Sequence, residues 1–97
     1  MTKVGTYVRA AHLFYQFEEM LHKNLDRQPN HQEMAVGLCM RPRMVEAIRL
    51  RFNKDGVVCM RLIEVASYMS VSIERVRQLL RLGLGRVTEQ MGKNGHS

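Results

Sequence analysis

The sequence predicts an all-α fold, a compact domain of five helices that contains two helix-turn-helix-like units. Three observations support this prediction. Apolar residues recur at intervals of three and four along most of the chain, which is the spacing of an amphipathic helix. Residues that favour helix starts, such as Asn30, Pro42 and Ser72, stand between these segments. A pattern typical of a short helix, a turn and a second helix occurs twice.

The first helix is predicted over about residues 5–24. Glu18 and Glu19 are expected on its solvated side, and Pro29 marks the break that follows, because a proline restricts the preceding residue to extended geometry. The expected buried side has the three-and-four spacing and consists of Tyr7, Ala10, Ala11, Phe14, Phe17, Leu21 and Leu25.

Two shorter helices are predicted next. Asn30 and Glu33 form a capping-box-like pair for a helix over about 31–38. Pro42 suits the first turn of a helix over about 42–52, where its missing N–H costs nothing. The arginines of this helix are expected to point largely outward, and they are Arg43, Arg49 and Arg51.

The C-terminal part begins after the clearest loop of the sequence, residues 53–56. We expect a helix over about 60–69, a reversal at Ser70 and an N-cap at Ser72 for the last helix. That helix should reach at least Leu82, beyond which Gly83 and Gly85 weaken it. The chain is thus divided into residues 1–52 with the first unit, residues 53–91 with the second, and a disordered tail over 92–97.

The two helix-turn-helix-like units align at a constant offset. Positions that must be buried in the angle between the helices hold an apolar residue or Ala in both units. The matched pairs are Glu33 with Glu64, Ala35 with Ala66, Leu38 with Met69, Met40 with Val71 and Val45 with Val76.

The charge is unevenly distributed along the chain. The net charge is +6, and residues 1–40 contribute none of it, since four Lys or Arg balance four Asp or Glu. Residues 41–86 carry ten Lys or Arg, nine of them Arg, against four acidic residues. A solvated basic surface would explain this pattern, but its concentration in the half of the chain that holds the second helix-turn-helix favours an anionic partner, which Arg suits through bidentate contacts.

Several classes of protein do not fit the sequence. No apolar run is long enough to cross a bilayer and the N-terminal residues do not match a secretory signal, so we expect a soluble, cytoplasmic protein without a membrane partner. Cys39 and Cys59 lack a Cys-x-x-Cys arrangement and are expected to be buried free thiols. The four histidines lack metal-ligand spacing and no catalytic arrangement is present, so we expect no enzyme, metal or cofactor.

The residues of the second unit resemble a known family. The stretch 61–66 followed by 71–78, which ends in Val-Ser-Ile-Glu-Arg-Val-Arg-Gln, resembles the C-terminal promoter-binding region (region 4) of bacterial sigma factors of the sigma-70 family. The Leu-Arg-Phe segment at 50–52 and, less closely, residues 25–40 are similar to the preceding helical region of that family. The resemblance covers about residues 13–87.

The resemblance implies that the helix after Ser72 enters the major groove of promoter DNA. Glu74, Arg77 and Gln78 match base-reading positions. Glu74 would contact cytosine, Arg77 guanine, and Gln78 either adenine or phosphate. Arg75 would contact backbone phosphate. The full DNA-binding set implied in this way is Ser72, Ile73, Glu74, Arg75, Arg77, Gln78 and Arg81.

The sequence also departs from the family pattern. Ile73 replaces a residue that is commonly polar, and Leu80 and Leu82 stand where the family often has charged residues. No segment resembles the one that recognises and melts the downstream promoter element, so the chain could not replace a full sigma factor.

We therefore expect a sigma-like transcription regulator that binds promoter DNA through its second helix-turn-helix and contacts RNA polymerase or another transcription protein. The first unit then serves as scaffold or partner surface. The alternative is an interaction module that binds RNA polymerase, a sigma factor or its own copy as a homodimer, and does not read DNA. Its contact surface would consist of Leu80, Leu82, Leu84 and exposed Met residues. A nonspecific nucleoid-type binder is a third possibility.

Overall fold

Five helices joined by loops make up the computed structural model, which describes the backbone of residues 3–95 and the side chains of residues 7–92. Within that range the fold is all-α, as predicted, and the nearest approach to a sheet is one antiparallel bridge between Phe52 and Val58. In chain order the helices are α1 (Lys3–Leu25), α2 (His31–Leu38), α3 (Pro42–Arg51), α4 (Leu62–Met69) and α5 (Ile73–Gly95).

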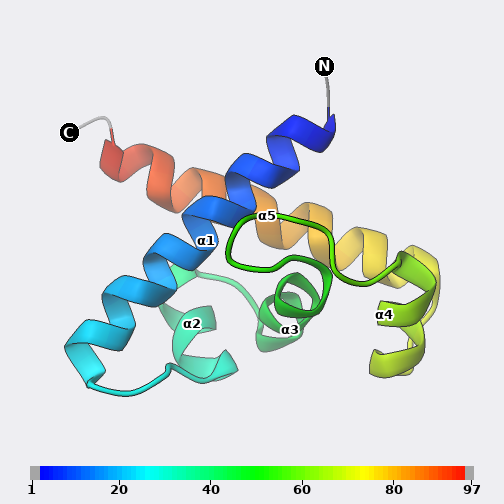
Figure 1. Cartoon of the computed structure of the whole chain (residues 1–97), viewed down its shortest axis with the longest axis horizontal. Coiled ribbons are helices and arrows are strands. Elements are labelled where there is room, and N and C mark those ends of the chain that lie inside the picture. The colour runs from blue at the N-terminus through cyan, green and yellow to red at the C-terminus, as the bar shows by residue number, and fades with distance from the viewer. Residues whose placement is uncertain (1–2, 96–97) are drawn as a thin grey trace.

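The long helix α5 organises the fold, because it contacts each of the other four helices. Its middle crosses α1, and α3 packs along it on the side where α2 also lies (Figure 1). The short helix α4 packs on the N-terminal part of α5, far from the C-terminal end of α1. As a result, α1 meets the middle of α5, around residues 81–88, and leaves the N-terminal part of α5 to α4 and α3.

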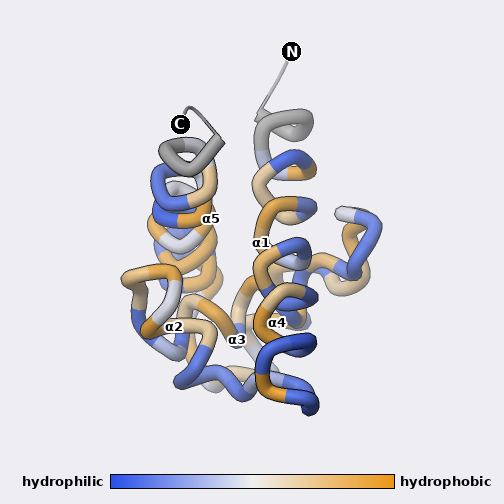
Figure 2. The backbone as a smooth tube through the Cα atoms, turned by 90° about the vertical axis from the view of Figure 1, so that its left-hand side faces the viewer, coloured by the Kyte–Doolittle hydropathy of each residue, from blue (hydrophilic) through white to orange (hydrophobic). Residues whose placement is uncertain are grey.

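The core lies where these helices meet. Hydrophobic residues recur turn after turn along α1 and α5 (Figure 2), as the three-and-four spacing requires. The buried apolar residues are Ala10, Ala11, Phe14, Met34, Ala35, Leu38, Val45, Ala47, Ile48, Phe52, Val65, Ala66, Met69, Val76, Leu79, Leu80, Leu84 and Val87. The predicted buried side of α1 is confirmed for Ala10, Ala11 and Phe14, and Leu25 at its end is 37% exposed. The other three predicted residues are only partly buried: Tyr7, Phe17 and Leu21.

The helix starts follow the local signals in the sequence. The backbone N–H of Glu33 donates to Asn30 Oδ1 over 2.8 Å, and Glu33 Oε1 accepts from the Asn30 N–H, which completes the predicted capping box. Pro42 is the first residue of α3. Ser72 Oγ accepts from the backbone N–H of Arg75 over 3.0 Å, so Ser72 caps α5 as expected.

The two helix pairs, α2–α3 and α4–α5, share one backbone geometry. Cys39 and Ser70, which occupy matched positions, both end the first helix in the left-handed conformation with φ of 56° and 59°. The N–H of the next residue donates to the alanine carbonyl of the preceding helix in both pairs, Met40 to Ala35 and Val71 to Ala66. The internal repeat of the sequence is therefore a repeat of local structure.

The last helix continues through both of its middle glycines. A Cβ on Gly83 would lie 3.1 Å from Met44 Cβ and 3.2 Å from Ile48 Cδ1, so the absence of a side chain lets α5 approach α3 closely. This tertiary contact outweighs the low helix propensity of glycine. The helix ends at Gly95, so the prediction of a disordered tail is wrong for residues 92–95, while residues 96–97 lie outside the described residues.

A buried ion pair joins three helices. Glu18 is only 8% exposed and accepts hydrogen bonds from Arg49 Nε (3.1 Å) and Nη2 (2.7 Å). Arg49 also donates to the carbonyl of Pro29 over 2.9 Å, and its Nη1 lies 2.7 Å from His31 Nδ1. The expectations that Glu18 is solvated and that Arg49 points outward are wrong, because each residue neutralises the other away from water.

Two further features concern the exterior. Cys39 and Cys59 are free but exposed, so the prediction of buried thiols is wrong: both stand in connections between helices rather than on a packed helix face. Among the helices of the described residues, none combines the length and the apolar character that crossing a bilayer requires.

Candidate nucleic-acid interface

The residues predicted to bind DNA lie on the surface of the first half of α5 and at its N-cap. Ser72, Glu74, Arg75, Arg77 and Arg81 are exposed. Ile73 and Gln78 are partly buried. The predicted set thus lies at or near the surface of α5, and Arg81 is the member that lies beside Tyr7 of α1.

The phase of α5 divides these residues into a ridge and two sides. Val76, Gly83 and Val87 are buried and define the side that faces the core. At 3.6 residues per turn, Glu74 and Gln78 lie on the opposite side, on a ridge that faces solvent. Arg77 and Arg75 then fall on the two sides of that ridge.

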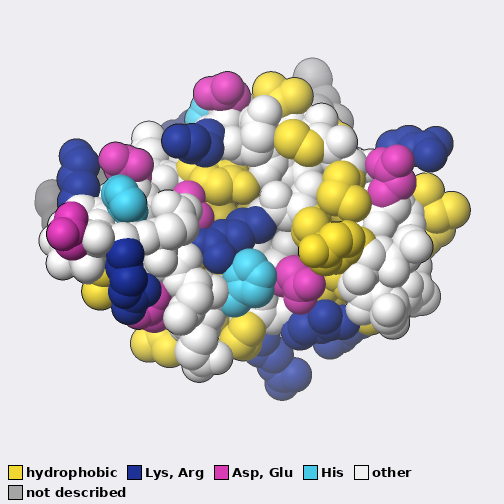
Figure 3. All heavy atoms as spheres, turned by 60° about the horizontal axis from the view of Figure 1, so that its bottom comes forward, with side chains coloured by type: hydrophobic (Ala, Val, Ile, Leu, Met, Phe, Trp, Pro, Cys, Tyr) yellow, Lys and Arg dark blue, Asp and Glu magenta, His cyan; other side chains and the backbone are white. Residues whose placement is uncertain are grey.

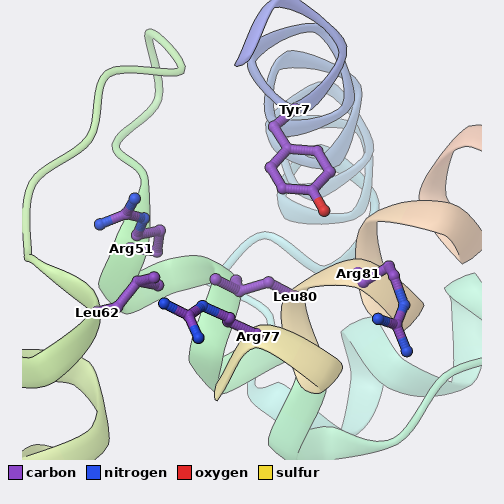
Figure 4. Close-up of a pocket in the computed structure, with 6 residues that line it drawn as sticks. All are labelled: Tyr7, Arg51, Leu62, Arg77, Leu80 and Arg81. Carbon is purple, nitrogen blue, oxygen red and sulfur yellow. The ribbon is translucent and has the colours of Figure 1, made fainter. Parts of the chain in front are cut away.

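One side of the ridge borders a cleft with a volume of about 370 Å³. Arg77 and Arg81 of α5 line it together with Arg51 from the end of α3. Figure 4 shows the ring of Tyr7 reaching into the cleft from α1 above, while the Arg77 side chain extends towards Leu62. Leu80 lies between the two α5 arginines at the base of the cleft.

The other side of the ridge borders a second cleft, of about 350 Å³. Arg75 and Arg86 of α5 line it with Arg41, the residue before α3. Met44 and Leu82 complete its lining. Three arginines therefore stand on each side of the exposed ridge of α5.

The contacts that these arginines make within the chain are weak. Arg77 Nη1 lies 3.4 Å from Glu74 Oε1, and both side chains are more than half exposed. Arg75 Nη1 donates to Gln78 Oε1 over 3.1 Å. Exposed pairs of this kind contribute little to stability, so the side chains can exchange these partners for a bound anion at low cost.

Arg51 is held more firmly than the arginines of α5. Its Nη1 donates to the carbonyl of Met60 over 2.7 Å, in the loop before α4. Partial burial lowers the pKa of the Arg51 guanidinium, although an arginine remains charged at any physiological pH. Arg51 thus places a fixed positive charge beside the mobile side chains of Arg77 and Arg81.

The leucines predicted to bind a partner are mostly in the core. Leu80 and Leu84 are 3% and 2% exposed, because they lie on the same side of α5 as Val76 and Val87. The prediction that they form an exposed contact surface is therefore wrong. Leu82 is 48% exposed and is the one of the three that a partner could reach.

Sequence reasoning missed four residues that the fold brings to this region: Tyr7, Arg41, Arg51 and Arg86. The concentration of arginine in residues 41–86 includes three of them and is the signal that could have found them. Tyr7 is far from α5 in sequence, and only the crossing of α1 over α5 brings it near.

A different face of the molecule, the one below α2 and α3 in Figure 1, has another character. Acidic, basic and apolar side chains are mixed across it rather than grouped by kind (Figure 3). The two groups of three arginines beside the α5 ridge contrast with this mixture.

Comparisons with protein-family models, with curated proteins and with solved structures find no match to this chain. The resemblance to sigma factors thus stands on the motif residues of the second unit. The functional conclusion has to come from those residues and from the geometry of α5.

Proposed function

We propose that this chain is a sigma-like transcription regulator that binds promoter DNA through the first half of α5. In this proposal α4 and α5 act as a helix-turn-helix. Helix α4 ends at Ser70, which adopts the left-handed conformation, and this turn would set the angle between α4 and α5. The exposed ridge of α5 then enters the major groove.

The observation that carries the proposal is the placement of arginines on both sides of a polar ridge. A helix in the major groove has a phosphate backbone on each side, and those phosphates supply most of the affinity. Arg81 and Arg51 would meet the phosphates of one strand, and Arg75, Arg86 and Arg41 those of the other, while Arg77 would lie beside the bases. A diffuse basic surface would not be expected to divide in this way.

Sequence reading would come from the ridge and its edge. Glu74 can accept from the N4 amino group of cytosine, and Gln78 can contact adenine. Arg77 can donate to O6 and N7 of guanine once it leaves Glu74, an exchange that costs little because the Arg77–Glu74 pair is exposed.

A selection experiment tests this function. Duplexes enriched from a random library by the purified chain should share a motif, and Gln78→Ala should relax the preference at one position of that motif by about 1–3 kcal/mol. Arg9→Ala is the matched control, since Arg9 is exposed on α1 and borders neither cleft. Enrichment of no motif would leave at most a nonspecific binder, and failure to bind duplex at all would refute the proposal.

Contact with RNA polymerase is the second part of the proposal, and the sigma resemblance supports it. Purified bacterial core polymerase, mixed with the chain at low micromolar concentration, should co-elute with it in size-exclusion chromatography. Independent elution of the two would remove polymerase from the proposal while leaving DNA binding in place.

Exposed apolar side chains on α4 and α5 support the alternative of an interaction module. Ile63 and Tyr68 on α4 are 54% and 68% exposed, and Leu82 on α5 is also exposed. Isolated exposed apolar residues are common on monomers, and the burial of Leu80 and Leu84 removes two of the three leucines on which this alternative was based. A polymerase complex that Leu82→Ser abolishes, together with no DNA binding by the wild type, would favour the module.

A further inference from the structure

The cleft between α1, α3, α4 and α5 has a chemistry that DNA binding alone does not use. Its lining comes from four helices and consists of Tyr7, Arg51, Leu62, Arg77, Leu80 and Arg81. The hydroxyl of Tyr7 points down towards Leu80 and α5, as Figure 4 shows. The cleft therefore combines a polar roof, basic walls and an apolar base.

The walls carry an excess of positive charge. Three guanidinium groups border the cleft and none of its lining residues is acidic. Arg81 makes no hydrogen bond or ion pair with any of the side chains that the structure describes. A bound anion would give Arg81 a strong partner that the described side chains do not supply. It could also replace Glu74 as the partner of Arg77, because the Arg77–Glu74 pair is exposed.

The base of the cleft favours a ligand that is more than an anion. Leu62 is partly buried and presents side-chain carbon to the cleft, whereas Leu80, which is 3% exposed, closes the cleft from the core side. A phosphodiester group gains little binding free energy from such a surface, because it has little apolar area to bury against it. A ligand with an apolar part gains more. A volume of about 370 Å³ falls within the usual range of small-molecule sites, roughly 300–1,000 Å³.

We propose that this cleft binds a small organic anion, in which a carboxylate, sulfonate or phosphate group is attached to an apolar ring or chain. The acidic group pairs with Arg81 and Arg77 beside the fixed charge of Arg51. The apolar part covers Leu62, and the Tyr7 hydroxyl donates to the ligand from the opposite side. Neither the sequence motif nor the fold class assigns a ligand to this place.

Such a ligand would also compete with DNA. Arg77 and Arg81 belong both to the cleft and to the face proposed for DNA, so the same side chains cannot serve both partners at once. This consequence rests on the proposed function, whereas binding of the anion does not. The chain would then release its promoter when the anion is present.

Titration with anilinonaphthalene sulfonate, an aryl sulfonate whose fluorescence rises in an apolar site, tests the proposal without DNA. The full chain should bind it saturably at a single strong site. Arg81→Ala should weaken that binding about tenfold, the loss expected for one charge-assisted hydrogen bond. Tyr7→Phe, which removes only a hydroxyl, should weaken it about three- to fivefold.

Two controls keep the result interpretable. Arg9→Ala removes one exposed arginine outside the cleft and should leave the affinity unchanged, while circular dichroism melts establish that every variant is folded. Equal losses in Arg9→Ala and Arg81→Ala, or no saturable binding by the wild type, would overturn the proposal. So would inorganic sulfate binding as tightly as the aryl sulfonate, because the apolar base would then contribute nothing.

Discussion

Replacing each of the two middle glycines of α5 by alanine should have opposite effects on stability. An alanine is worth about 0.5–1 kcal/mol more than a glycine inside a helix. A Cβ at Gly85 meets no heavy atom within 4 Å, so Gly85→Ala should stabilise the chain by about that amount. A Cβ at Gly83 would lie 3.1 Å from Met44 Cβ, which the backbone of α3 holds in place.

The second contact of the Gly83 Cβ is also confined. Ile48 Cδ1 lies 3.2 Å away, and Ile48 is fully buried, so neither neighbour can move without disturbing the core. Overpacking of this kind costs about 1–3 kcal/mol. After the gain in helix propensity, Gly83→Ala should destabilise the chain by up to about 2 kcal/mol.

Urea denaturation followed by circular dichroism measures both effects, and a change of about 1 kcal/mol should move the thermal midpoint by roughly 4–8 °C in a domain of this size. A stabilising effect of the same size in both variants would refute the close approach of α5 to α3. Destabilisation by Gly85→Ala would show that the middle of α5 is not an open helical surface.

Three further substitutions or titrations follow from the structure. Glu18→Gln should destabilise the chain by about 3 kcal/mol in urea denaturation, because it leaves the buried charge of Arg49 without its partner; an unchanged midpoint would contradict the buried pair. The hydrogen bond from Arg27 lowers the pKa of Glu33 to about 2. This carboxylate should therefore stabilise the fold above its unfolded pKa of 4.5 and lose that effect as pH falls towards 2. An NMR titration that places the midpoint of Glu33 near pH 4.5 would contradict this hydrogen bond. Burial raises the pKa of Tyr15 to about 12, so stability should decline as pH rises from 10 to 12, and ultraviolet absorbance should show one late-titrating tyrosine.

Local signals in the sequence were sufficient for the helix starts and the turns. The caps at Asn30 and Ser72 depend on residues within three positions of each other, and Pro42 begins α3 through its own backbone geometry, so the sequence contains the whole signal. The repeat aligns Cys39 with Ser70, and both adopt the left-handed conformation, whereas the sequence pattern predicted only a reversal at Ser70.

Features that depend on contacts between distant segments could not be read in this way. Glu18 and Arg49 belong to different helices, and nothing in the spacing of either reveals that they meet. Gly83 looks unfavourable for a helix until α3 is seen beside it. The part of the candidate site on α5 was predictable from its motif, whereas Tyr7 and Arg51 enter it only through the packing of α1 and α3.

The dependence of DNA affinity on salt tests most directly whether the arginines on both sides of the α5 ridge contact DNA. Fluorescence anisotropy with a selected duplex should give a steep negative slope of log affinity against log salt concentration, and Arg75→Ala and Arg81→Ala should each reduce that slope by about 1, the change expected for one lost phosphate contact. Arg9→Ala should leave the slope unchanged. Slopes that are the same in all four proteins, or an equal reduction by Arg9→Ala, would contradict a helix held between two phosphate backbones.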